Sequence, residues 1–183
     1  KPPSSIISSG TPHVCPPGRS ETHHELELGV IIGERARHVS VDKAMQYVGG
    51  YCLALDMTDR EGQQQAKSAG KPWTMAKAWD TSCPVSQFVA VAEVPDYQVL
   101  NMWLKVNGER SPRQFGSPSQ MIFDIPTLIS EVSKFHTLEP FDIILTGTPE
   151  GVGPVYPGDT ITAGITELDI ELRVPIVSWE SVI

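Results

Sequence analysis

The chain has 183 residues and a formal net charge of −8, with 40% hydrophobic and 20% charged residues. This length fits one domain, residues 1–183, with a substantial core. Its 14 Lys and Arg residues form no basic run, so we expect no nucleic-acid partner. No apolar run approaches the roughly 20 residues that cross a bilayer, so we expect a soluble protein without a membrane partner.

Three cysteines, Cys15, Cys52 and Cys83, lie far apart in the sequence. Their odd number and the lack of a CxxC pair predict neither a disulfide framework nor a zinc knuckle. We therefore expect a reducing compartment, with each thiol buried as a small apolar group.

The first third of the chain predicts two strands around a short helix. Residues 1–20 are rich in Pro, Ser and Gly and indicate irregular or edge structure. From residue 23 to residue 32 the sequence alternates, which is typical of a strand. One face would carry Glu25, Glu27 and Gly29, and the other Leu26, Leu28 and Val30. Ser40 would cap the short helix, and Gly49 and Gly50 would end it in a left-handed turn.

The second strand, residues 51–56, would place Asp56 at the end of a face that also carries Cys52 and Ala54. Thr58 and Glu61 have the spacing of a capping box, so a helix should begin there. Gly70 and Pro72 would close it.

The rest of the chain alternates short strands with turns. Strands are expected at residues 87–93, 103–107, 142–146 and 170–176, with a positive-φ turn at Asn107-Gly108. Asp124 would cap a helix that buries Leu128, Ile129, Val132 and Phe135. Many turns and few helices indicate a β-dominated α+β domain.

Glu25 and Glu27 are the first candidates for a functional site. On a regular strand, residues i and i+2 share a face with their Cα atoms about 6.5–7 Å apart, so both carboxylates could hold one cation. Alternating glutamates more often form a solvated strand face, and this pair alone does not decide between the two interpretations.

Asp56 is the best third ligand, because a charge that ends a face of small side chains is costly to desolvate without a cation or strong donors. A helix-entry aspartate near Thr58 is the rival interpretation. Three carboxylates suit Mg²⁺ or Mn²⁺. Zinc is less favoured, although His23 and His24 keep it open.

A glycine-rich segment, residues 147–153, follows the strand at 142–146 and could turn N–H groups and the Thr148 hydroxyl toward an anion. It has neither the ending of a P-loop nor the spacing of a dinucleotide fingerprint. A plain tight turn is the alternative. Arg60, Gln63 and Lys77 are further candidates for binding a carboxylate.

Several motifs occur in order along the chain at consistent spacing. They are His23-His24-Glu25-Leu26-Glu27-Leu28-Gly29, Tyr47-Val48-Gly49-Gly50-Tyr51, Leu55-Asp56-Met57-Thr58, Pro72-Trp73-Thr74-Met75-Ala76-Lys77 and Gly147-Thr148-Pro149-Glu150-Gly151-Val152-Gly153-Pro154. Together they resemble the fumarylacetoacetate hydrolase family, in particular its acylpyruvase and oxaloacetate decarboxylase branch.

This resemblance implies a mixed β-roll or pseudo-barrel with a few short helices, usually a homodimer. It implies Mg²⁺ or Mn²⁺ at Glu25, Glu27 and Asp56. Substrate contacts would come from Arg60, Gln63, Lys77 and Thr148, with Lys77 and Gln63 in catalytic roles. Members of this branch also carry a catalytic histidine and glutamate on a lid helix before a Lys-Pro pair, and this sequence begins at such a pair.

The function expected from the resemblance is metal-dependent cleavage of a carbon–carbon bond in a 2-keto acid, by acylpyruvate hydrolysis, oxaloacetate decarboxylation or both. Both reactions pass through a pyruvate enolate, which a metal stabilises as a Lewis acid. Without the lid dyad we expect decarboxylation to survive better than hydrolysis.

Two rivals stay open: an isomerase or decarboxylase of unsaturated 2-keto-diacids from aromatic catabolism, and a non-catalytic metal or keto-acid binding module. A mitochondrial matrix and a cytoplasmic location are both compatible with the sequence, since a transit peptide would precede Lys1.

Overall fold

The computed structural model describes residues 1–182, whose strands form sheets of six, five and two strands. The strands, in chain order, are β1 (Ile6–Ser8), β2 (His13–Val14), β3 (Thr22–His24), β4 (Leu26–Ile32), β5 (Val48–Leu55), β6 (Cys83–Val85), β7 (Val89–Ala90), β8 (Met102–Val106), β9 (Gln114–Gly116), β10 (Ile143–Leu145), β11 (Gly153–Val155), β12 (Thr160–Ile165) and β13 (Ile170–Val177). The α-helices are α1 (Arg60–Ser68), α2 (Thr74–Lys77) and α3 (Ile125–Phe135). Short 3₁₀ helices are η1 (Pro3–Ser5), η2 (Val41–Tyr47), η3 (Val91–Glu93), η4 (Tyr97–Val99), η5 (Pro118–Gln120), η6 (Thr166–Leu168) and η7 (Trp179–Ser181).

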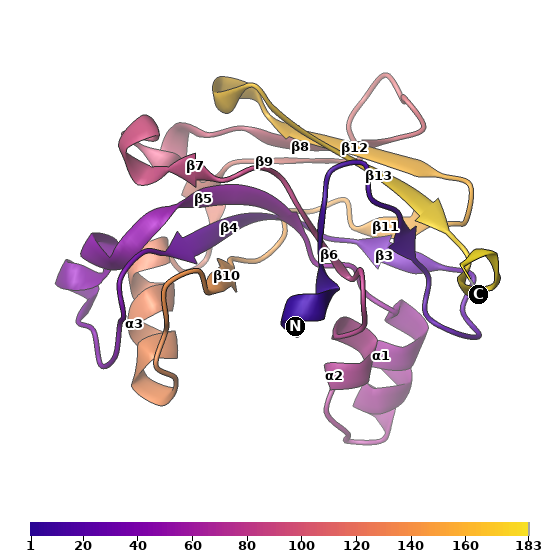
Figure 1. Ribbon diagram of the computed structural model, residues 1–183, viewed down its shortest axis with the longest axis horizontal. Helices are drawn as coiled ribbons and strands as arrows, with labels where there is room; N and C mark the ends of the chain where they lie inside the picture. The colour runs from indigo at the N-terminus through magenta and orange to yellow at the C-terminus, as the bar shows by residue number, and fades with distance from the viewer. Residues whose placement is uncertain (183) are drawn as a thin grey trace.

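The two large sheets form two layers (Figure 1). The six-stranded sheet has the order β1-β6-β5-β4-β10, with β7 also paired to β5, and the five-stranded sheet has the order β2-β13-β12-β8-β9. Neither order closes on itself among the described strands, so the fold is a strand-dominated α+β fold without a closed barrel. The expected fold class is confirmed. No helix in residues 1–182 is long and apolar enough to cross a membrane.

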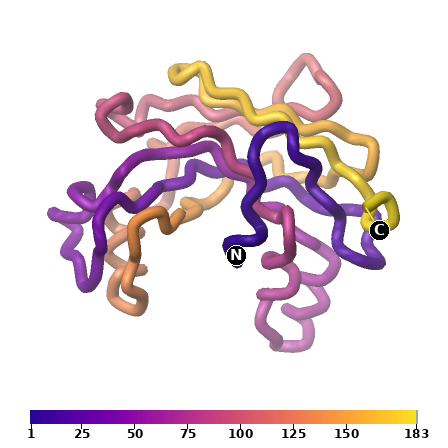
Figure 2. Tube along the Cα trace, viewed as in Figure 1, coloured from indigo at the N-terminus to yellow at the C-terminus, as the bar shows by residue number. Residues whose placement is uncertain are grey.

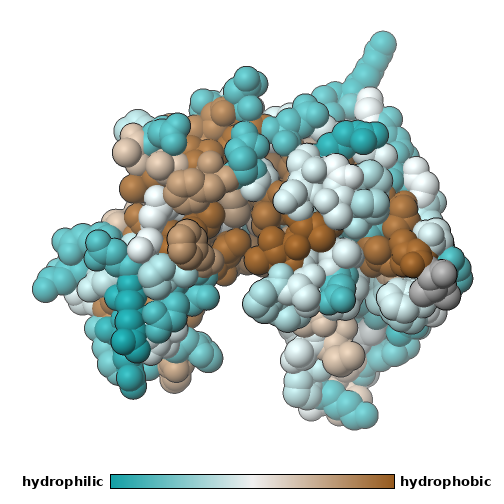
Figure 3. All heavy atoms as spheres, in the orientation of Figure 1, coloured by the Kyte–Doolittle hydropathy of each residue, from teal (hydrophilic) through white to brown (hydrophobic). Residues whose placement is uncertain are grey.

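Helix α3 and the pair α1–α2 lie on the side of the six-stranded sheet away from the five-stranded sheet (Figure 1). Figure 3 shows this molecule hollowed between the two groups of helices, with apolar surface along the upper edge of the hollow. The helices therefore flank one region of the six-stranded sheet and leave it uncovered.

Strands β4 and β5 carry the core on one face. Leu26, Leu28 and Val30 of β4 are fully buried in the main hydrophobic cluster, as the alternating pattern predicts. Leu53 and Leu55 of β5 belong to the same cluster. The opposite face of both strands is therefore the one that carries Glu27 and ends at Asp56, as predicted.

The N-terminal segment runs as short edge strands, which agrees with the expectation of edge structure for residues 1–20. Strand β1 pairs in parallel with β6, and β2 pairs in parallel with β13. Figure 2 shows this indigo segment passing beside the yellow C-terminal strand.

Two local predictions in the first third are wrong. Gly49 and Gly50 do not end a helix but lie inside β5, without positive φ. They are needed for close packing, because a Cβ on Gly50 would lie 2.2 Å from the carbonyl oxygen of Val89. The cap of α1 is Asp59, which accepts from the N–H of Gly62, whereas the Thr58 hydroxyl donates to the carbonyl of Asp56.

The later elements follow the predictions with two further differences. The strand expected at residues 87–93 is only two residues long and continues as the 3₁₀ helix η3. Helix α3 begins after Asp124, which accepts from the N–H of Thr127, but Phe135 is 82% exposed rather than buried. Asn107 and Gly108 both have positive φ, as the turn requires.

Candidate metal and substrate site

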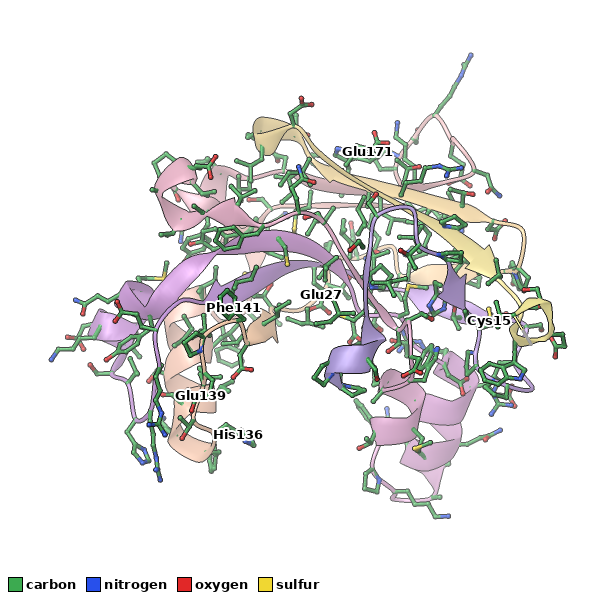
Figure 4. All side chains as sticks on the ribbon, in the orientation of Figure 1. Cys15, Glu27, His136, Glu139, Phe141 and Glu171 are labelled. Carbon is green, nitrogen blue, oxygen red and sulfur yellow. The ribbon has the colours of Figure 1, made fainter. Side chains whose placement is uncertain are left out.

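The pairing of β4 with β5 brings the candidate carboxylates together. Glu27 lies opposite Ala54 in the antiparallel register. Beyond the end of β5, the N–H of Asp56 donates to the carbonyl of Glu25 at 2.8 Å. Glu25, Glu27 and Asp56 therefore share one face of two neighbouring strands, and Figure 4 places Glu27 centrally, between α3 and the pair α1–α2.

The three carboxylates converge on one point. One oxygen from each of Glu25, Glu27 and Asp56 lies within 4.8 Å of the others. Glu25 and Glu27 are only 8% and 4% exposed. This excludes the solvated strand face as the interpretation of the two glutamates, since buried carboxylates require partners.

Two lysines supply positive charge to this cluster. Lys77, the last residue of α2, places Nζ 2.6 Å from Oε2 of Glu25 and 2.7 Å from Oδ2 of Asp56. Lys1 lies 2.8 Å from the other oxygen of Asp56 and also donates to the hydroxyl of Ser82 at 3.2 Å. Sequence reasoning treated Lys1 only as part of a Lys-Pro pair and missed this contact.

Helix α1 presents two further candidates from its first turn. The Asp59 cap fixes the start of the helix and is itself held by Arg19 at 3.0 Å. Arg60 then donates to Oε1 of Glu25 and, at 2.6 Å, to Oε1 of Gln63. Arg60 therefore lies beside Glu25, with Gln63 next to it, and their contact with a substrate stays a prediction.

Glu27 differs from its two neighbours because no cationic side chain in residues 1–182 forms an ion pair with it. Its hydrogen-bond partner is the N–H of Gly147, which donates to Oε2 at 2.6 Å. Burial, with a smaller contribution from the nearby charges of Asp56 and Glu25, raises the pKa of Glu27 to about 7, against the lowering effect of the Gly147 hydrogen bond. A cation would favour the ionised form.

The segment after β10 brings Thr148 to the same region. Gly147 has a φ of +98°, which lets the chain turn directly beside Glu27. The hydroxyl of Thr148 accepts a hydrogen bond of 2.8 Å from the side chain of Gln114 on β9. Gln114 is completely buried, and no sequence motif singled it out.

The two histidines lie outside the cluster. His23 contacts Glu21 at 3.0 Å, and His24 contacts Gln114 at 2.8 Å. The only group of at least three potential ligands among the described residues consists of carboxylates. An oxygen-only donor set fits a hard divalent cation such as Mg²⁺ or Mn²⁺ better than zinc.

Residues 1–175 match the family model described as fumarylacetoacetate (FAA) hydrolase C-terminal. The chain belongs to the fumarylacetoacetate hydrolase family. Among its relatives, the mitochondrial oxaloacetate tautomerase of Homo sapiens is 54% identical over 165 residues, which cover 90% of this chain and 74% of that protein. The mitochondrial oxaloacetate decarboxylase of Dictyostelium discoideum is 47% identical and covers 97% of this chain and 81% of its own length.

Solved structures of fumarylacetoacetate hydrolase relatives agree with the fold. The fumarylpyruvate hydrolase of Pseudomonas aeruginosa, in complex with Mn²⁺ and pyruvate, superposes with a TM-score of 0.90 at 32% identity. The superposition covers 97% of this chain and 77% of that one. The resemblance inferred from the motifs is confirmed, and the chain shares its family with enzymes of keto-acid chemistry.

Proposed function

We propose that this chain is a divalent-metal-dependent enzyme that cleaves the carbon–carbon bond beside the keto group of a 2-keto acid, as in oxaloacetate decarboxylation or acylpyruvate hydrolysis. The observation that carries the proposal is the convergence of Glu25, Glu27 and Asp56 within 4.8 Å of one another, with Glu27 between α3 and the pair α1–α2 (Figure 4). The names of the relatives support a keto-acid substrate.

Glu25, Glu27 and Asp56 would hold Mg²⁺ or Mn²⁺, whose charge would stabilise the negative charge that develops on the keto oxygen. The Mn²⁺ in the related fumarylpyruvate hydrolase structure supports a cation of this type. A site made only of carboxylates binds both Mg²⁺ and Mn²⁺, so activity measurements with each ion distinguish them.

The cationic and hydroxyl groups around the carboxylates would orient the substrate. Lys77 carries an ammonium between Glu25 and Asp56, and would contribute positive charge toward the reacting centre. Arg60, aligned by Gln63, offers a planar donor for a carboxylate. Thr148, beside Gly147, would contribute a hydroxyl from the other side.

A pocket of about 280 Å³ borders this region and would receive the part of the substrate beyond the keto acid. Its wall contains Thr148 and Gly147 together with apolar side chains, which include Met121, Phe123 and Leu128. An apolar wall favours a neutral acyl group over a second carboxylate. Among substrates long enough to reach this wall, it favours acylpyruvates over unsaturated keto-diacids, whose isomerase is the rival within the family.

Keto–enol tautomerisation of oxaloacetate is a second candidate, favoured by the 54% identity to a protein of that name. It would use the same stabilisation of negative charge on the keto oxygen and would move a proton without breaking a carbon–carbon bond. Decarboxylation and tautomerisation need no activated water, whereas acylpyruvate hydrolysis does.

The homodimer and the mitochondrial location are proposals as well. The mitochondrial names of the relatives support that compartment over the cytoplasm. Light scattering would establish the oligomeric state, with a dimer expected.

The function is tested with a panel of oxaloacetate, acetylpyruvate and longer acylpyruvates in added Mg²⁺, Mn²⁺ or Zn²⁺. Pyruvate release and loss of enol absorbance are followed separately, so that cleavage and tautomerisation are distinguished. In Glu27→Gln, the rate of pyruvate release and the rate of enol loss should both fall by a factor of about 100 or more. Glu171→Gln, on the exposed outer face of β13, is the matched control and should keep full activity (Figure 4).

A non-catalytic keto-acid binding module would bind pyruvate with a metal ion and release no product from any member of the panel. That outcome would refute the enzymatic proposal, whereas unchanged turnover in Glu27→Gln would refute the metal site assigned to Glu25, Glu27 and Asp56.

A further inference from the structure

The side chain of Gln114 joins the two sheets at the edge of the candidate site. Strands β3 and β4 are separated at Glu25, and the N–H of Leu26 finds its acceptor in Oε1 of Gln114, at 3.0 Å. The same oxygen lies 2.8 Å from Nδ1 of His24. Both His24 and Gln114 are completely buried.

The hydrogen bonds to backbone groups determine the orientation of the Gln114 amide. The N–H of Leu26 is always a donor, so its partner must be the amide oxygen. The carbonyl of Pro149 is always an acceptor, and it lies 2.9 Å from the amide nitrogen. The amide therefore cannot rotate by 180° without leaving both backbone groups unsatisfied.

This orientation determines the roles of two neighbours. Nδ1 of His24 faces the amide oxygen and must carry a proton, which leaves the lone pair on the buried Nε2. Oγ1 of Thr148 lies 2.8 Å from the amide nitrogen and must accept its second hydrogen. The Thr148 hydroxyl proton is then free to be donated away from Gln114.

We propose that Gln114, held in one orientation by His24 and Leu26, positions the Thr148 hydroxyl as a hydrogen-bond donor to the carboxylate of the substrate. Gln114 and His24 are thus positioning residues, and Thr148 makes the contact. This inference rests on the proposed function, because it needs a 2-keto acid at the site. A carboxylate can only accept hydrogen bonds, so a hydroxyl that is fixed as a donor matches it.

The test compares Gln114→Met in three backgrounds: wild type, Thr148→Ser and Thr148→Val. Methionine is similar in length to glutamine and has no amide group to donate or accept. In wild type and Thr148→Ser, which both keep a hydroxyl, Gln114→Met should raise KM for the keto acid about fivefold to tenfold with little change in kcat. Thr148→Val alone should already raise KM about tenfold or more. Adding Gln114→Met to Thr148→Val should not raise KM any further.

A purely structural role for Gln114 would raise KM equally in all three backgrounds, and that result overturns the proposal. Gln98→Met, at an exposed position, is the matched control and should change neither constant. If wild type neither binds nor converts a keto acid, the proposed function fails first and this inference fails with it. That outcome is distinct from an equal effect in the three backgrounds.

A second measurement uses wild-type protein and remains decisive if Gln114→Met does not fold. Nitrogen NMR of the histidine side chains should find His24 with its proton on Nδ1. A proton on Nε2 would place two lone pairs against each other at the contact with Gln114, and would overturn the proposed orientation of the amide.

Discussion

The backbone N–H of Gly147 donates a 2.6 Å hydrogen bond to Oε2 of Glu27. This contact joins strand β4, which carries Glu27 and directly follows Glu25, to the loop that carries Thr148, although Glu27 and Gly147 are 120 positions apart. A change in the charge of Glu27 therefore changes the strength of its hydrogen bond to the loop. The candidate metal ligands and the candidate substrate-binding groups are connected through this bond.

The affinity for a divalent ion should increase with pH. Burial raises the pKa of Glu27 to about 7, and only the ionised carboxylate binds a cation well. Below that pKa, a proton competes with the metal, so the affinity for Mn²⁺ should fall roughly tenfold per pH unit. Calorimetric titration between about pH 5.5 and pH 8 measures this, with proton release on binding. Glu27→Gln should lose the pH dependence, and a flat profile in wild type would contradict the prediction.

Lys77→Met should destabilise the metal-free protein and leave the metal-bound protein less affected. The substitution leaves Glu25 and Asp56 without the ammonium that now bonds to both. Because the site is partly exposed, we expect a loss of about 1–3 kcal/mol in unfolding free energy, and added Mn²⁺ should restore part of it. Thermal unfolding in EDTA and in Mn²⁺ provides the comparison.

Lys134→Met is the control for that experiment. Lys134 pairs with Glu131 on the exposed surface of α3, where an ion pair contributes at most about 1 kcal/mol. The unfolding temperature of Lys134→Met should equal that of wild type in EDTA, and it should equal that of wild type again in Mn²⁺. An equal metal response in both variants would refute the role assigned to Lys77.

The stability of the fold should fall as pH is lowered, through His13. Burial lowers the pKa of His13 to about 4, and its ring nitrogens contact Thr81 and Thr22 in the neutral state. The unfolded chain takes up the proton near pH 6.5, so this stability is complete above that value and is lost as pH falls toward 4. Protonation of His13 should lower the free energy of unfolding by at most about 3 kcal/mol in total.

Urea unfolding at about pH 7 and about pH 5 measures the His13 effect. His13→Gln should have a smaller loss of stability between these two conditions than wild type. His136→Gln, at an exposed position directly after the last residue of α3, should behave as wild type (Figure 4). Equal losses of unfolding free energy in all three proteins would show that His13 does not cause the loss of stability between these two pH values.

Gly151→Ala should destabilise the fold much more than Gly158→Ala does, although both glycines have φ near +100°. A Cβ on Gly151 would lie 1.9 Å from the carbonyl oxygen of Arg113, whereas nothing lies within 4 Å of one on Gly158. Gly158→Ala should cost about 1–2 kcal/mol from backbone conformation alone. Gly151→Ala should cost more and should raise KM by displacing the Thr148 loop. Equal destabilisation of the two variants, measured by urea unfolding, would contradict this.

The parts of the fold that depend on local pattern could be predicted. The alternation around Leu26 and Leu28 predicted both the strand and its buried face, because burial on one side of a sheet imposes a period of two. The cluster of Glu25, Glu27 and Asp56 was predicted for the same reason, with the third ligand chosen by the cost of burying a charge.

The parts that depend on distant contacts could not be predicted. Gly50 looked like a helix stop, and only the approach of Val89 explains its place inside β5. The contact between His24 and Gln114 spans 90 positions and has no periodic or motif signal. Phe135 continued the apolar stripe of α3, but the buried face of that helix carries Ile125, Ile129, Ser130 and Ser133, and the Phe135 ring lies off that face and is exposed.

Strand β4 has the hydrophobic core on one face and the acidic cluster on the other. Any repacking of Leu26 or Leu28 that moves the strand by a few tenths of an ångström moves Glu25 and Glu27 by the same amount. Thermostabilised variants of this chain should accordingly be sought in residues far from β4, because gains made beside that strand will change the reaction as well as the melting temperature.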